Sequence, residues 1–287
     1  MDMRVGNNIK PMVPQRTVGT RKTENSSFAA TLQKTEKASA TKDTASISQN
    51  PLDKRLENVQ KVIEGMDFTG KSAPEVYRNI LEAYENEFGN LDKLFYQDEG
   101  NGYKNYNMIE KDYHLMLKEK LPPYHCENPV FGNSDPDPYA NLHYEAMGYD
   151  KMTKAERIAA IEKRIGGSGY IDRVAMIAEM NRANVLQGRE GLDIFQSLTR
   201  KMEKEYCKTY GLDYIKWQED VGKFRDQNGN SLLYQRMIDW ANQQTISWID
   251  ILDSIQENEA LRPEQQEEII KDLQGALELP EKQNNGK

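Results

Sequence analysis

The residues best suited to metal or acid–base chemistry fall between positions 96 and 170. They are His114, His125, Cys126 and His143. Neutral imidazole and thiolate are preferred ligands of zinc. Structural zinc sites usually carry two pairs of ligands with two to four residues between the members of a pair, whereas here only the adjacent His125 and Cys126 are close. The spacing therefore argues against a zinc site, and we expect no metal and no other cofactor.

Patterns typical of nucleophilic catalysis are incomplete in this sequence. Ser168 lies in Gly167-Ser168-Gly169, but Tyr170 stands where a nucleophile elbow needs its second glycine, and no strand is predicted before it. Neighbouring residues such as His125 and Cys126 are poorly placed for a hydrogen bond between their side chains. We therefore assign no catalytic residue and expect the glycine-rich stretch to connect two helices.

An enzyme remains the alternative interpretation. A hydrolase-like site would lie in the segment 96–150, in a pocket between two helical subdomains. Its groups would be the three histidines His114, His125 and His143 with the acids Asp135 and Asp137.

Nine of the fifteen tyrosines also lie between positions 96 and 170. Prolines and Asn/Gly clusters in the same stretch predict that much of it is loop. Aromatic side chains on loops supply contact area for partners, so we expect an interaction surface at Tyr103, Tyr106, Tyr139 and Tyr144. The competing interpretation is that the tyrosines fasten long loops onto a helical core.

Apolar residues recur at helical spacing almost everywhere after position 50. Capping boxes at Ser72–Glu75 and Thr153–Glu156 each precede such a stripe, and no strand-like run of comparable length competes. The stripes predict helices from about residue 56 to residue 277. The fold class we expect is all-α, an irregular multi-helix bundle with a disordered N-terminal tail and a Tyr-rich loop region.

Composition and charge exclude several classes of protein. Of the 287 residues, 37% are hydrophobic and 29% charged, and the longest apolar runs fall far short of the ~20 residues of a membrane span. We expect a soluble chain with no transmembrane helix and no signal peptide. The net charge is -8, and residues 51–287 carry -12. Because such a body repels phosphate, nucleic acid is not an expected partner.

Residues 1–50 differ in composition from the rest. They are rich in Ser, Thr, Asn, Gln and Lys, contain one aromatic residue, and carry a net charge of +4. Such a segment cannot bury enough apolar surface to offset the ordering entropy, so it is predicted to be disordered. The expected organisation is a polar tail at 1–50, a helical pair with Tyr/His-rich loops at 51–150, and a helical bundle at 151–287.

Two short strings in the tail carry a resemblance. Ser27-Phe28-Ala29-Ala30-Thr31-Leu32 and Asp43-Thr44-Ala45-Ser46-Ile47-Ser48 resemble the polar leaders of uncharacterised clostridial-type proteins and of flagellar axial and anti-sigma proteins. The resemblance covers about fifty residues. It implies a bacterial protein whose tail is an export leader or a chaperone-binding segment, so the expected location is the cytoplasm or outside the cell by a non-classical route.

The functional hypothesis is a non-enzymatic helical protein-interaction protein with a protein partner. A third interpretation is a cytoplasmic regulator whose basic tail binds an acidic partner. The sequence leaves the identity of the partner and the oligomeric state open.

Overall fold

Helices make up the regular structure of this chain in the residues that the computed structural model describes, which are 51–98, 102–132, 137–225 and 231–277. Within these ranges there are twelve α-helices, one 3-10 helix, and a single isolated bridge between Arg225 and Ser231. The predicted all-α, multi-helix fold is confirmed. The expected disorder of residues 1–50 concerns residues outside the described ranges and stays a prediction.

The first half of the body contains five α-helices. They are α2 (Pro51–Glu64), α3 (Ala73–Phe88), α4 (Leu91–Gln97), α5 (Lys104–Lys120) and α6 (Ala140–Ala146). The predicted capping box before α3 is present, because the Glu75 carboxylate accepts the Ser72 backbone N–H at 2.8 Å.

The second half begins with a 3-10 turn and continues through seven α-helices. They are η2 (Tyr149–Lys151), α7 (Lys154–Ile165), α8 (Tyr170–Arg182), α9 (Glu190–Thr209), α10 (Tyr214–Asp220), α11 (Leu232–Ala241), α12 (Trp248–Gln256) and α13 (Pro263–Leu277). The second predicted capping box begins α7, where Thr153 and Glu156 satisfy each other's backbone amides.

The expected loop between α7 and α8 depends on glycine. Gly167 has a positive φ of 86°, and a Cβ atom there would fall on the Asp172 carboxylate. That carboxylate accepts the Gly169 N–H at 3.0 Å and so caps α8. The turn therefore reverses the chain within a few residues and brings α8 back along α7.

The segment predicted to be Tyr-rich loop is partly helical. Tyr106, Tyr113 and His114 lie on α5, and His143 and Tyr144 lie on α6. The irregular part between these helices is confined to residues 121–139, of which 133–136 lie outside the described ranges. Burial of α5 on one side and of α6 on several sides outweighs the turn-forming residues that surround them, which is why local composition overestimated the loop.

Two hydrophobic cores fill the body, whose residues 49–287 belong to one compact unit. The first core gathers buried side chains of α2, α3 and α5 with Leu142 and Ala146 of α6. The second core gathers buried side chains of the elements from η2 to α13, together with Tyr144 of α6. Helix α6 thus contributes to both cores.

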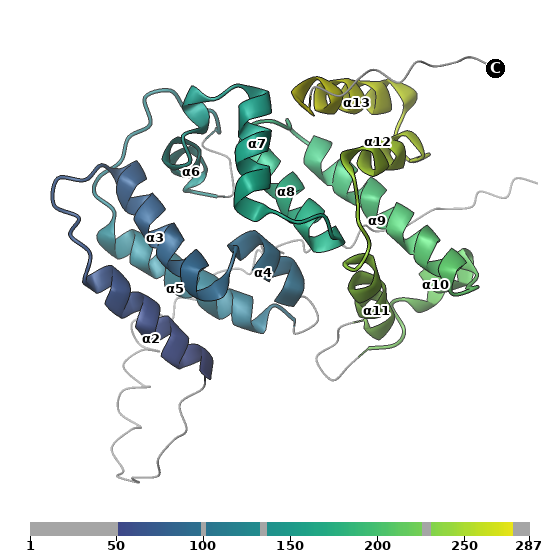
Figure 1. Cartoon of the computed structure of the whole chain (residues 1–287), viewed down its shortest axis with the longest axis horizontal. Helices are drawn as coiled ribbons and strands as arrows, with labels where there is room; N and C mark the ends of the chain where they lie inside the picture. The colour runs from purple at the N-terminus through teal and green to yellow at the C-terminus, as the bar shows by residue number, and fades with distance from the viewer. Residues whose placement is uncertain (1–50, 99–101, 133–136, 226–230, 278–287) are drawn as a thin grey trace, which may run out of the picture. The chain divides into compact units, whose positions relative to one another are not determined.

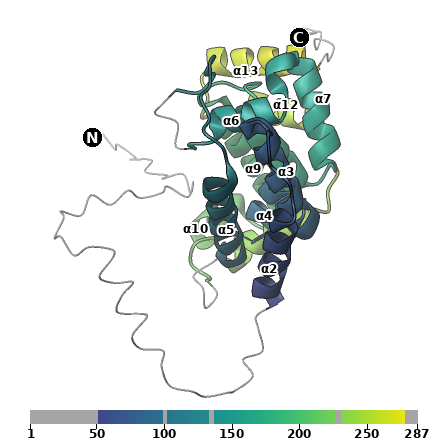
Figure 2. The same ribbon diagram turned by 90° about the vertical axis from the view of Figure 1, so that its left-hand side faces the viewer.

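Helices α4 and α6 lie where the two cores meet (Figures 1 and 2). Helix α4 packs on α3 and α5 of the first core and on α8 of the second, and α6 packs on both α3 and α8. A polar cluster also lies at this seam. None of the helices in the described ranges combines the length and apolar character needed to cross a membrane.

Candidate functional site

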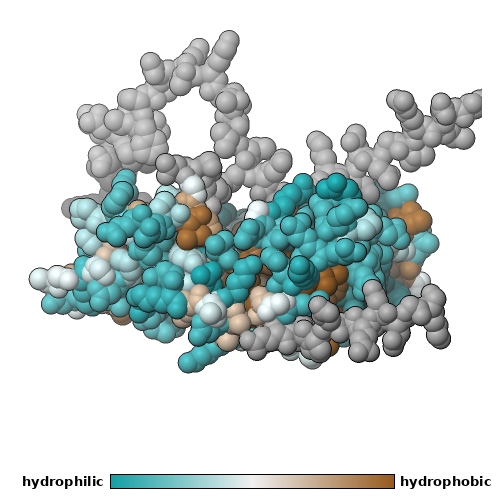
Figure 3. Space-filling model, turned by 90° about the horizontal axis from the view of Figure 1, so that it is seen from above, coloured by the Kyte–Doolittle hydropathy of each residue, from teal (hydrophilic) through white to brown (hydrophobic). Residues whose placement is uncertain are grey.

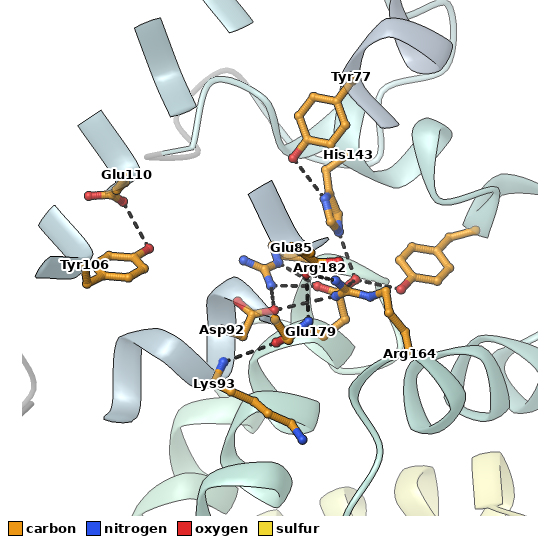
Figure 4. Close-up of polar contacts among 12 residues, drawn as sticks. Tyr77, Glu85, Asp92, Lys93, Tyr106, Glu110, His143, Arg164, Glu179 and Arg182 are labelled. Carbon is orange, nitrogen blue, oxygen red and sulfur yellow. Dashed lines mark hydrogen bonds and ion pairs between the residues drawn. The ribbon is translucent and has the colours of Figure 1, made fainter. Parts of the chain in front are cut away.

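The polar cluster is centred on Glu179 of α8, whose side chain is fully buried. Its Oε1 atom accepts hydrogen bonds from His143 Nε2 at 2.9 Å and from the Tyr149 hydroxyl at 2.6 Å. The Arg164 guanidinium lies 2.9 Å from the same oxygen. Oε2 accepts from Arg182 Nε at 2.8 Å (Figure 4). A buried carboxylate is costly unless it is paired and hydrogen-bonded, and these donors meet both requirements.

The two arginines extend the cluster to neighbouring helices. Arg164 of α7 donates to Glu85 of α3 at 2.7 Å, and its Nη2 lies 3.6 Å from Asp92 of α4. Arg182 of α8 also pairs with Asp92. Charges from α3, α4, α7 and α8 therefore meet at one point, and two guanidiniums face three carboxylates.

His143 connects this cluster to the first core. Its Nδ1 atom lies 3.0 Å from the hydroxyl of Tyr77 on α3. An ionised carboxylate can only accept, so the hydrogen on Nε2 is assigned toward Glu179. The result is a buried chain of hydroxyl, imidazole and carboxylate that spans α3, α6 and α8.

The electrostatics of these hydrogen-bonded side chains favour a charged carboxylate on Glu179 and neutral phenols on its tyrosine neighbours. Burial alone would raise the pKa of Glu179, but His143, Arg182 and Arg164 outweigh it and hold that pKa well below its ordinary value. Burial raises the pKa of Tyr77 well above its usual range, and it does the same for Tyr149. Neither phenol is therefore prepared to release a proton near neutral pH.

Access decides what this arrangement can do. Hydroxyl–imidazole–carboxylate chains also occur in nucleophilic catalysis, where the hydroxyl must reach a substrate. Here Tyr77 is 5% exposed, His143 4% and Glu179 0%. Among the described residues these three side chains are almost closed to solvent, and the geometry assigns them no reaction.

The four residues considered as metal ligands lie in different surroundings. His143 is in the buried cluster, His125 is exposed on the loop after α5, and His114 packs against the Tyr139 ring at 5.7 Å. Cys126 donates to Glu145 Oε1 at 3.2 Å. Across the described part of the chain, no group of three or more His, Cys, Asp or Glu side chains is arranged to hold a metal ion.

Of the described residues of the alternative enzyme site, His114, His143 and Asp137 each have contacts of their own. Asp135 lies outside the described residues, and Asp137 accepts the Tyr139 backbone N–H at 2.8 Å. His114 and His143 are linked through ring contacts. The ring of His114 contacts that of Tyr139, Tyr139 contacts Tyr77, and Tyr77 contacts His143, at centroid distances between 5.7 and 6.5 Å.

The four tyrosines predicted to form a contact surface divide into two groups. Tyr103, Tyr106 and Tyr139 are half-buried, whereas Tyr144 is 6% exposed and belongs to the second core. Tyr144 is therefore excluded from any surface, because its position on α6 turns its ring inward. Tyr103 and Tyr106 lie together: the Phe95 ring stacks on Tyr103 at 4.7 Å and meets Tyr106 edge-on at 5.0 Å.

Sequence reasoning missed Glu179, Arg164 and Arg182, which form the centre of the cluster. A signal was present in α8, where apolar residues occur on nearly every side and Glu179 stands among them. A charge inside a helix that is buried all round needs a partner, and Arg182 three residues later supplies one. The other partners come from distant segments and leave no local trace.

No protein-family model, curated protein or solved structure matched the chain in comparisons with all three. Function is therefore inferred from the residues and their geometry.

Proposed function

We propose that this chain is a non-enzymatic helical protein-interaction protein. The observation that carries the proposal is where apolar side chains remain exposed. Ten large hydrophobic side chains are exposed in the described ranges, and five of them lie between positions 210 and 232. We call these five the α10 patch: Tyr210, Leu212, Ile215, Phe224 and Leu232.

Exposed apolar groups that occur close together in the sequence favour a binding surface over a surface that only contacts solvent. On the face seen in Figure 3, hydrophobic residues form small separate areas among hydrophilic ones. Burial of the α10 patch against a partner would remove apolar surface from water, which is the main driving force of association.

The half-buried aromatic group of Phe95, Tyr103 and Tyr106 is the second proposed contact surface. It retains the tyrosines favoured by the sequence and lies at the junction of α4 and α5. Tyrosine rings combine apolar area with a polar tip, and such residues are common at the centres of interfaces. The surrounding body is acidic, so this surface would suit a partner with Lys or Arg side chains.

Site-specific photo-crosslinking in the native cells tests the proposal. A photoreactive amino acid would replace Ile215 or Tyr103 in separate variants of the full chain. Leu115 of α5 is the matched control, because it is 55% exposed and lies outside both surfaces. We expect discrete crosslinked species from Ile215 and Tyr103 and none from Leu115. Equal crosslinking at all three positions, or none, would contradict the assignment.

The tail carries a separate proposal, that it acts as an export leader. It is supported by the resemblance of residues 27–32 and 43–48 to such leaders. Fractionation of the native cells would compare the full chain with a variant lacking residues 1–50. We expect the full chain outside the cell and the truncated one inside; retention of both in the cytosol would refute export.

A further inference from the structure

The α10 patch is formed by the way α10 lies on its neighbours. Helix α10 has one turn directed inward, where Trp217 is 5% exposed, and this orientation leaves Ile215 70% exposed on another side. Tyr210 ends α9 and packs only on the Tyr206 ring, at 4.7 Å, among the ring contacts of the described residues. The chain before and after α10 therefore directs large apolar groups to the solvent.

A backbone hydrogen bond joins Phe224 and Leu232, the two residues of the patch that follow α10. The Leu232 N–H donates to the Phe224 carbonyl at 3.0 Å, next to the bridge between Arg225 and Ser231. Phe224 and Leu232 thus start from neighbouring points of the backbone, and their side chains are 58% and 47% exposed. Ser231 donates to the Val221 carbonyl just after α10, so this pair is tied to the same corner of the body.

The local charge around the patch differs from that of the whole body. Residues 51–287 carry -12, whereas the stretch 204–225 holds five Lys or Arg and four Asp or Glu. Exposed side chains of both signs alternate there, as in Lys208, Asp213, Lys216 and Glu219. The patch is thus an area of nearly balanced charge on an acidic body.

Balanced charge favours one kind of occupant. A strongly acidic or basic partner would be matched by a surface whose charges are mainly of the opposite sign. The charges around this patch are not mainly of one sign. Two copies of an acidic body repel each other at most orientations, so they can approach best where the local charge is close to zero. In a two-fold pair each copy also presents the same residues, and lysines of one can face carboxylates of the other.

We propose that the α10 patch binds a second copy of this chain in a two-fold pair, with Ile215 and Phe224 buried at the contact. This inference depends on the proposed interaction function and names the partner of one of its surfaces. Ile215 is the most exposed large apolar side chain of the described residues, so its burial would contribute most to the pairing.

Sedimentation velocity of the full chain over a range of concentrations tests this pairing. We expect a concentration-dependent dimer in the wild type. Ile215→Glu and Phe224→Glu place a charge in the contact and should each weaken the dimer by about tenfold or more. Leu115→Glu and Val62→Glu are matched controls, since both residues are 55% exposed and lie outside the patch. Circular dichroism would verify that each variant is folded.

Two results would overturn the proposal: a monomeric wild type at every concentration, or equal weakening by Leu115→Glu and Ile215→Glu. The crosslinking at Ile215 separates this failure from that of the proposed function. Crosslinks from Ile215 to a different protein, with a monomeric wild type, would refute the second copy and leave the interaction surface standing. A monomer without crosslinks at Ile215 or at Tyr103 would refute both.

Discussion

Glu179 illustrates how a single buried residue joins distant parts of this chain. Its carboxylate accepts hydrogen bonds from α6, η2 and its own helix, forms an ion pair with Arg164 of α7, and is fully buried. Pairs of this kind add little net stability over an apolar core, but they become very costly when one partner is removed. The cluster therefore makes the native arrangement specific.

Replacement of Glu179 by glutamine should destabilise the body strongly. The variant keeps the size of the side chain but leaves Arg164 and Arg182 facing Glu85 and Asp92 without their central charge. We expect a loss of about 3–5 kcal/mol in the free energy of unfolding. Urea denaturation, monitored by tryptophan fluorescence, measures this loss in the free energy of unfolding. Glu110→Gln is the control, because that carboxylate is partly exposed and accepts the Tyr106 hydroxyl at 3.3 Å. A loss below about 1 kcal/mol, no larger than in the control, would be incompatible with this role.

Acid should destabilise the wild type through the same residue. The folded pKa of Glu179 lies well below the ordinary 4.5 of an unfolded chain, so the folded state binds fewer protons. The stabilisation is present above pH 4.5 and is lost as the pH falls toward the folded pKa. Urea midpoints measured from pH 7 to pH 3 should therefore fall more in the wild type than in Glu179→Gln. Parallel curves for the two proteins would refute the linkage.

At the scale of elements, local signals allowed the sequence to predict much of the helix structure. The capping boxes before α3 and α7 act within one turn, and both are present. Helices α4 and α6 were not predicted, since each has only seven residues and is held by packing on α3 and α8. The site was missed for the same reason: Glu85, Asp92, His143 and Glu179 meet only after folding.

The capping box of α7 provides a stability test at this scale. Thr153→Ala removes the side chain that accepts the Glu156 backbone N–H. We expect a loss of about 1 kcal/mol in the free energy of unfolding. Thr209→Ala serves for comparison, because the Thr209 hydroxyl donates only to the Glu205 carbonyl near the exposed end of α9. Equal effects of the two substitutions would contradict the importance of the cap.

The anchoring of α10 on α9 should depend on pH near neutrality. Burial raises the pKa of Glu203 to about 7, although Gln218, Tyr214 and Arg200 oppose the rise. The neutral acid is favoured in the folded state, so its stabilising contribution is complete below pH 4.5 and is lost as the pH rises through about 7. The urea midpoint of the wild type should therefore decrease between pH 5 and pH 8.

The variant Glu203→Gln cannot ionise at this position and is the direct comparison. Its urea midpoint should change less over the same pH range than that of the wild type. An unchanged pH dependence in Glu203→Gln would show that other groups cause it.

For the whole molecule, the two hydrophobic cores and the seam between them matter most. All three tryptophans lie in or against the second core, whereas α2, α3 and α5 contain none. The organisation expected from the sequence divided the body at residue 150, but it did not include the sharing of α6 between two cores. Side chains from residues 56 to 276 build these cores, and no local pattern shows how they combine. Binding surfaces on such a body keep their relative positions only while the seam is closed.

We expect the Glu179 cluster to make the two cores open as one unit. Native-state hydrogen exchange of α3 and α9, in the wild type and in Glu179→Gln, tests this claim. The slowest amides near Ile80 and Ile194 are predicted to share one opening free energy in the wild type. In the variant the value for α3 should fall below that for α9. Unequal values in the wild type, or equal values that persist in Glu179→Gln, would contradict the claim.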